Sequence, residues 1–261
     1  MDSTQLFIVF LGGLIAGTMN SVAGGGTLVS YPALLLAGLN PLAANATNTM
    51  ALLPGIFSSA TAYRHHSTPM RGWILFFSPV SLAGGLVGAW LLVRTPPEIF
   101  ARLAPFLILF ATLILMLQSF HQIRGRKGEG QSLREKSHSG VWLVGAALYQ
   151  FAVSVYGGYF GAGIGILMLA SLGVLGFGHI HQMNILKSVL AFLINLVAAA
   201  YFLFSGLIVW LPCVVMAVGA VLGGYAGAHF CQKLPQQTVR WIIIGIGLSV
   251  ALILFVGQFE P

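Results

Sequence analysis

Eight long apolar runs follow one another along this chain, and short polar segments separate them. Six of the runs have 20 to 24 residues, and an α-helix needs about 20 apolar residues to cross the hydrocarbon core of a bilayer. The pattern therefore predicts a bundle of membrane-spanning helices. The runs lie at 5–39, 42–63, 71–93, 98–120, 140–178, 182–205, 207–228 and 238–257.

The composition of the chain favours the same fold class. Charged residues make up 7% of the 261 residues, whereas a soluble globular domain carries about 25%. With 57% hydrophobic residues and a mean hydropathy of +0.92, the chain cannot cover a surface that faces water. We expect an all-α, multi-pass integral protein of the cell membrane, with the lipid bilayer as its surroundings.

Two runs, 5–39 and 140–178, are too long for a single spanning helix. As one straight helix, the first would reach about 52 Å at 1.5 Å per residue, well beyond the roughly 30 Å hydrocarbon core. Glycines interrupt both runs, at 24–26 and at 157–165. We predict that each run forms two shorter helices, bent or re-entrant, around a non-helical break.

The two halves of the chain repeat each other at an offset of 139 residues. The offset aligns Gly24 with Gly163 and Asn45 with Asn184, although coincidental glycine spacing is an alternative explanation. It also aligns Gly26 with Gly165, the cluster Gly84, Gly85 and Gly88 with Gly223, Gly224 and Gly227, and Arg94-x-Pro96 with Lys233-x-Pro235. We predict repeats at 1–120 and 140–261, joined by a basic cytoplasmic linker at 121–139, an organisation typical of transporters.

The basic residues indicate how the runs cross the membrane. If all eight runs cross once, seven basic residues lie inside and four outside; if the two broken runs are re-entrant, the distribution becomes nine against two. The positive-inside rule favours the second arrangement, with six full spans, two re-entrant hairpins and inverted halves. The nine inside residues are Arg64, Arg71, Arg124, Arg126, Lys127, Arg134, Lys136, Lys233 and Arg240.

No acidic residue lies in the interior of an apolar run. Asp2, Glu129, Glu135 and Glu260 lie outside the runs, and Glu98 is the first residue of the run at 98–120. This argues against a carboxylate-based cation transporter and against paired-carboxylate hydrolysis. The two cysteines show no metal-binding spacing, so we expect neither a metal nor a cofactor. The basic residues behind the net charge of +7 lie mostly in short loops, where they set the orientation of the chain in the membrane. No nucleic-acid partner is therefore expected.

The polar residues that remain near the breaks suit an anion. A helix that begins after a glycine break directs N–H groups and a partial positive charge into the gap, and two such helices would form a cradle. Lys187 is a functional candidate because a lysine at membrane depth is costly, although snorkelling to the interface is the alternative. The expected substrate-binding residues are Asn20, Ser21, Gly24, Gly25, Gly26, Thr27, Asn45, Asn48, Tyr156, Tyr159, Gly161, Gly163, Gly165, Asn184 and Lys187.

The glycines and amides also have a purely structural interpretation. Glycines permit close helix packing, and buried amides such as Asn195 can join helices. The ladders Gly84-x-x-x-Gly88 and Gly219-x-x-x-Gly223-x-x-x-Gly227 are expected to pack either within the bundle or at a homodimer seam.

At these residues the sequence resembles the sulfite exporter TauE/SafE family, also called the 4-toluene sulfonate uptake permease family. The resemblance covers nearly the whole chain and implies transport of a small sulfur-containing oxyanion such as sulfite, thiosulfate or an organosulfonate. Ser171 stands where the first half has Pro32, so the halves are not equivalent. The motifs are Ala23-Gly24-Gly25-Gly26-Thr27, Tyr31-Pro32, Ala43–Thr49, Gly161-Ala162-Gly163-Ile164-Gly165 and Asn184-x-x-Lys187.

We therefore expect a secondary transporter or exporter that works by alternating access, and not an enzyme. A passive anion channel is the first alternative. An intramembrane enzyme is a more distant one, because it requires a nucleophile beside a base or metal ligands at helical spacing, and the sequence has neither pattern. A structural membrane scaffold is a further alternative, and it would have no ligand.

Overall fold

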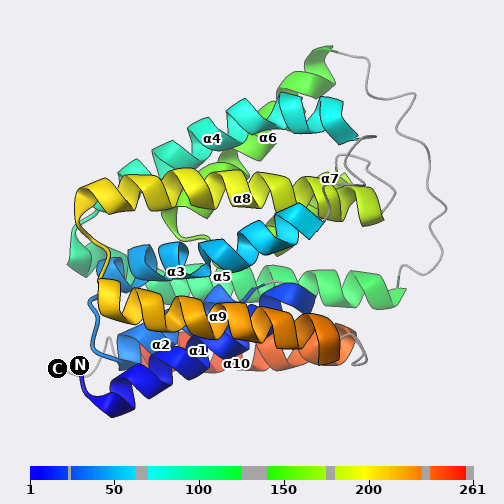
Figure 1. The fold of residues 1–261 in the computed structure, drawn as a ribbon. Helices are drawn as coiled ribbons and strands as arrows, with labels where there is room; N and C mark the ends of the chain where they lie inside the picture. The colour runs from blue at the N-terminus through cyan, green and yellow to red at the C-terminus, as the bar shows by residue number, and fades with distance from the viewer. Residues whose placement is uncertain (23–24, 63–69, 125–139, 175–179, 231–235, 257–261) are drawn as a thin grey trace.

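The computed structural model describes residues 1–22, 25–62, 70–124, 140–174, 180–230 and 236–256. These residues form helices that lie roughly side by side, with no strand among them (Figure 1). In chain order they are α1 Ser3–Val22, α2 Thr27–Leu36, α3 Pro41–Ala62, α4 Arg71–Arg94, α5 Pro97–Arg124, α6 Gly140–Tyr159, α7 Ile164–Val174, α8 Ile180–Ser205, α9 Trp210–Phe230 and α10 Gln236–Val256.

Within the described residues, six helical stretches are long and apolar enough to cross a membrane. The protein is therefore an all-helical, multi-pass membrane protein, as its composition predicts. The six stretches are Ser3–Ser21, Arg71–Arg94, Pro97–Leu117, Gly140–Tyr159, Gln182–Ser205 and Trp210–Gly227.

The two over-long runs each contain two helices, as predicted, but the two helices differ in length. α1 and α6 have 20 residues each, whereas α2 has 10 and α7 has 11. A helix of 20 residues reaches about 30 Å, so the first helix of each run is long enough to cross a bilayer. The runs at 42–63 and 238–257 extend beyond the residues whose side chains are described, so their crossings stay predictions.

α1 and α2 run antiparallel. A Cβ built on Gly12, in the middle of α1, would stand 2.5 Å from Ala33 Cβ in α2, and Gln5 Nε2 lies 3.7 Å from a Cβ built on Gly38. The end of α2 therefore returns to the end of the bundle at which α1 begins (Figure 1).

Glycines in the left-handed conformation interrupt the helices at both breaks. Gly25 has a φ of 86°, Gly161 of 72° and Gly163 of 68°, values that L-residues with a Cβ rarely adopt. At the second break, the N–H of Gly161 donates to the carbonyl of Tyr156, and this hydrogen bond closes the end of α6. The positions of the breaks thus follow directly from the glycines in the sequence.

The glycine ladders pack within the bundle. A Cβ on Gly223 would collide with the carbonyl oxygen of Leu14, which brings α9 against α1. A Cβ on Gly88 would collide with the carbonyl of Val155, which brings α4 against α6. Packing between helices of the same chain therefore accounts for these glycines. A homodimer stays a prediction, and these glycines do not support it.

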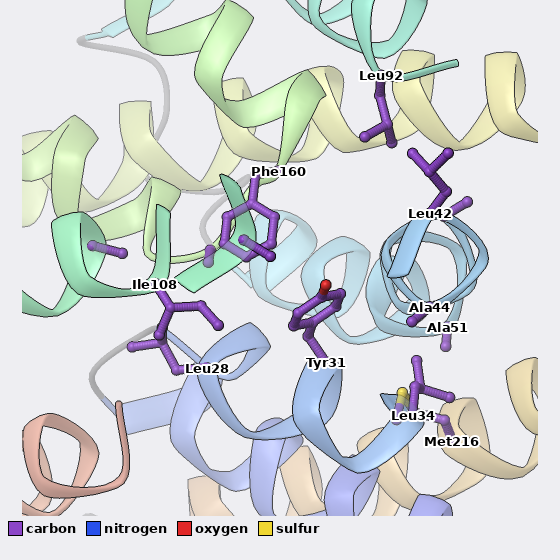
Figure 2. Close-up of a cluster of buried hydrophobic side chains, with 14 of the residues drawn as sticks. Leu28, Tyr31, Leu34, Leu42, Ala44, Ala51, Leu92, Ile108, Phe160 and Met216 are labelled. Carbon is purple, nitrogen blue, oxygen red and sulfur yellow. The ribbon is translucent and has the colours of Figure 1, made fainter. Parts of the chain in front are cut away.

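A hydrophobic core joins α2 to the second break (Figure 2). The rings of Tyr31 and Phe160 meet edge to face, with centroids 5.3 Å apart and planes at 82°. Leu28 and Ile108 are fully buried beside them. This contact packs α2, which follows the first break, against the second break.

Candidate functional site

A cavity of about 90 Å³ lies between the two breaks and helices α3 and α8. Residues from both halves of the chain form its wall. They are Asn20, Gly25, Thr27, Asn48, Thr49, Leu52, Ile56, Phe160, Gly161, Gly163, Ile164, Gly165, Lys187, Ser188, Ala191 and Asn195.

The α3 and α8 walls of the cavity match residue by residue. Each lining position on α3 has a counterpart on α8 that lies 139 residues later in the chain, which is the offset that aligns the two halves of the sequence. Three of these positions follow the i, i+4, i+8 spacing of one helix face. The pairs are Asn48 with Lys187, Thr49 with Ser188, Leu52 with Ala191, and Ile56 with Asn195.

The first turn of α7 faces the cavity with backbone donors. The first N–H groups of a helix have no partner within the helix. At α7, Ile164 N–H donates to Gly161 O and Leu167 N–H to Gly163 O. In the described part of the chain, neither the N–H of Gly163 nor that of Gly165 donates to a backbone carbonyl. Both glycines line the cavity, so these donors and the positive end of α7 are positioned for an anion.

The first break is braced differently. Asn20 Oδ1 accepts a 2.8 Å hydrogen bond from the N–H of Gly26, which takes up one donor of α2. Gly26 itself packs against α1, where a Cβ would collide with the carbonyl of Ala16. Gly25 and Thr27 do line the cavity. The two breaks are therefore braced in different ways.

Lys187 supplies positive charge to the cavity wall. It lies seven residues after α8 begins, about 10 Å along the helix, and is half-buried. A Cβ built on Gly165 would stand 3.5 Å from Lys187 Cδ and 3.9 Å from Cε, so the aliphatic chain runs across the start of α7. Among its described lining residues, the cavity contains no carboxylate.

Asn45 and Asn48 occupy the buried face of α3. Asn45 is 1% exposed, and its Nδ2 donates to the carbonyl of Tyr159 over 2.9 Å, which fastens α3 to the second break. Asn48 is 2% exposed and lines the cavity. The oxygen of each amide is buried and has no hydrogen-bond partner among the residues that the structure describes.

The structure brings about half of the predicted site residues to the cavity: Asn20, Gly25, Thr27, Asn48, Gly161, Gly163, Gly165 and Lys187. Ser21 and Tyr159 point elsewhere, because Ser21 Oγ donates to Thr18 O beside α9 and Tyr159 Oη lies 3.3 Å from Thr95 Oγ1. Tyr156 braces the second break by donating to Ala162 O over 2.8 Å. Gly26, Asn45 and Asn184 are not among the lining residues, and Gly24 lies outside the described residues.

Several lining residues were not predicted as site residues. Leu52, Ile56 and Ala191 are apolar and carry no chemical signal of their own. Their helical spacing from Asn48 and Lys187 is the signal that would have identified them. Thr49 and Ser188 follow the same two residues directly, and Asn195 ends the α8 face.

Residues 9–254 of the chain match the family model of the sulfite exporter TauE/SafE. The chain belongs to the sulfite exporter TauE/SafE family. The match spans both breaks, α3 and α8, so every element of the cavity wall lies within the family's region. This confirms the resemblance seen in the sequence motifs.

Individual relatives of this TauE/SafE family member are also membrane proteins by name. A probable membrane transporter protein of Haemophilus influenzae is 30% identical, covering 92% of this chain and 90% of its own. The probable membrane transporter protein ORF9 of Sinorhizobium is 26% identical, with coverage of 98% and 94%. No solved structure matches the chain.

Proposed function

We propose that this TauE/SafE family protein is a secondary transporter that moves a small sulfur-containing oxyanion, such as sulfite, by alternating access. The cavity carries the proposal. Lys187, the donors at the start of α7 and nearby amides and hydroxyls converge on one space that has no carboxylate among its described lining residues. Preorganised donors of this kind favour an oxyanion over a cation or a neutral solute.

Alternating access follows from an inverted repeat, which the helix order supports. Pro41, Arg71 and Pro97 begin α3, α4 and α5. Ile180, Trp210 and Gln236 begin α8, α9 and α10, each 139 positions later. The corresponding helices α3 and α8 run in opposite directions (Figure 1), as inverted halves require. In this proposal both breaks are re-entrant, and the cavity lies at the interface between the halves.

A thermal-stability panel tests the binding step. Purified protein in detergent is heated with sulfite, thiosulfate, sulfoacetate, sulfate or chloride at constant ionic strength. A ligand present at 100 times its Kd stabilises the native state by about 2.7 kcal/mol, so sulfite or another sulfur oxyanion should raise the melting temperature and chloride should not. A melting temperature that no anion raises would contradict the proposal and favour a structural membrane scaffold.

A further inference from the structure

We propose that Asn45 and Asn48 form part of a sodium site beside the anion cavity, so that bound sodium drives or stabilises anion binding. The inference rests on the proposed function, because it supplies the coupling ion for that transport. Three buried polar atoms that have no hydrogen-bond partner in the described part of the chain motivate it: Asn45 Oδ1, Asn48 Oδ1 and Tyr31 Oη. A buried polar atom without a partner destabilises the fold, which favours a ligand that satisfies it.

The two amides lie on one face of α3. Residues three apart on a helix are neighbours on its surface, so the side chains of Asn45 and Asn48 lie next to each other. The hydrogen bond from Asn45 Nδ2 to Tyr159 O identifies the other atom of that amide as an acceptor. Asn48 is 2% exposed and also lines the cavity, so this pair connects the buried oxygens to the anion space.

Tyr31 lies close to the same region from α2. Its hydroxyl points away from α2, toward the space between Phe160 and α3 (Figure 2). Phe160 lines the cavity together with Asn48, and Tyr31 is fully buried against it. A hydroxyl oxygen accepts as well as donates, so Tyr31 is the candidate for a third oxygen ligand.

Neutral oxygens select a hard monovalent cation. Amide oxygens bind hard cations, whereas transition metals prefer imidazole or thiolate. Among the described residues, no group of three His, Cys, Asp or Glu side chains could hold a metal ion. No carboxylate lies in the interior of an apolar run to balance a divalent ion or to carry a proton. Broken-helix transporters coordinate sodium with unwound backbone carbonyls, which are also neutral oxygens.

The charges explain why such a site would couple to the anion. A sodium ion and Lys187 on their own repel each other across the cavity. A divalent oxyanion bound between them attracts both and neutralises the total charge. Sodium should therefore raise the affinity for the anion, and by thermodynamic linkage the anion should raise the affinity for sodium by the same factor.

Sodium titration of the purified protein, without any sulfur oxyanion, tests the site. N-methyl-D-glucamine chloride keeps the ionic strength constant, and potassium chloride serves as the ion control. Wild-type protein should gain thermal stability with sodium, saturably, and not with potassium. Asn48→Leu should weaken the apparent sodium affinity roughly tenfold or more, since one buried oxygen ligand is lost.

Two further variants separate ligation from folding. Asn48→Asp keeps an oxygen at the same place and should retain the sodium response. Ser171→Ala removes a buried hydroxyl in α7 that donates only to Met168 O of its own helix, and it should behave as wild type. An absent sodium effect in wild type, or equal responses of the Asp and Leu variants, would overturn the sodium site; a water molecule on these oxygens would give that result.

The sulfite affinity of wild-type protein, measured with and without sodium, completes the test and needs no variant. Tighter sulfite binding in sodium supports the coupling. Sulfite binding of equal strength in both media would overturn the coupling while leaving the proposed anion site in place.

Discussion

Asn45 Nδ2 in α3 donates a 2.9 Å hydrogen bond to the carbonyl of Tyr159, 114 positions later in the chain, where α6 ends. The bond satisfies a carbonyl at the end of α6 and ties the first half of the chain to the second break. A polar side chain of one half thus holds the backbone of the other half in place, at the point where the cavity begins.

Removal of this bond should loosen the second break. We expect Asn45→Leu to lower the free energy of unfolding by about 1–3 kcal/mol, because the Tyr159 carbonyl is left without its donor. Thermal denaturation in detergent measures the change. Thr95→Val is the matched control, because it removes a 3.3 Å contact with the hydroxyl of the same tyrosine and a hydrogen bond to Leu91 O within α4, but leaves the donor of the Tyr159 carbonyl in place. Equal melting temperatures for the two variants would contradict the assigned role of Asn45.

Gly163, which is left-handed, should be sensitive to substitution by alanine, whereas Gly165 should tolerate a methyl group. Gly163 has a φ of 68°, so Gly163→Ala should cost about 1–2 kcal/mol in backbone strain and impair anion binding. Gly165→Ala places a Cβ 3.5 Å from Lys187 Cδ, an ordinary van der Waals contact, and should fold normally. Melting temperatures of the two variants, measured side by side, check this. The prediction fails if Gly163→Ala is as stable as Gly165→Ala.

Close contact between α1 and α9 should depend on the absence of side chains. A Cβ on Gly223 would collide with the carbonyl of Leu14, so Gly223→Ala should force the helices apart and destabilise the protein by about 1–3 kcal/mol. Gly245→Ala, where a Cβ meets nothing within 4 Å, is the control. If both substitutions leave the melting temperature unchanged, α1 and α9 do not pack as described.

The broken helices were predictable because a length argument is independent of side-chain detail. A run of 35 apolar residues does not fit as one helix in a bilayer, and residues other than glycine rarely adopt the φ values seen at Gly25, Gly161 and Gly163. The unequal lengths of α1 and α2 were not predictable, because the position of a break says nothing about where the flanking run meets the membrane surface.

The cavity was predictable only in part, for a related reason. Asn48 and Lys187 are conspicuous in an apolar run and do line the cavity. Tyr159 is equally conspicuous, but it precedes a break at which the chain changes direction, and periodicity does not report where its side chain points. Leu52 and Ala191 are ordinary membrane residues, and only the packing of α3 against α8 shows that they face a cavity.

Sulfite counterflow tests the central claim most directly. Proteoliposomes are loaded with unlabelled sulfite and diluted into a trace of radiolabelled sulfite, and label uptake is followed for wild type and for Lys187→Met. We predict saturable accumulation of label in wild type when valinomycin and equal potassium on both sides hold the membrane potential at zero, a condition under which a passive channel does not accumulate label. Loss of one charged hydrogen-bonding group costs about 1.5–3 kcal/mol, so the variant should bind sulfite roughly 10- to 100-fold more weakly. Equal accumulation in both proteins would contradict the assignment of Lys187 and of the cavity as the transport site.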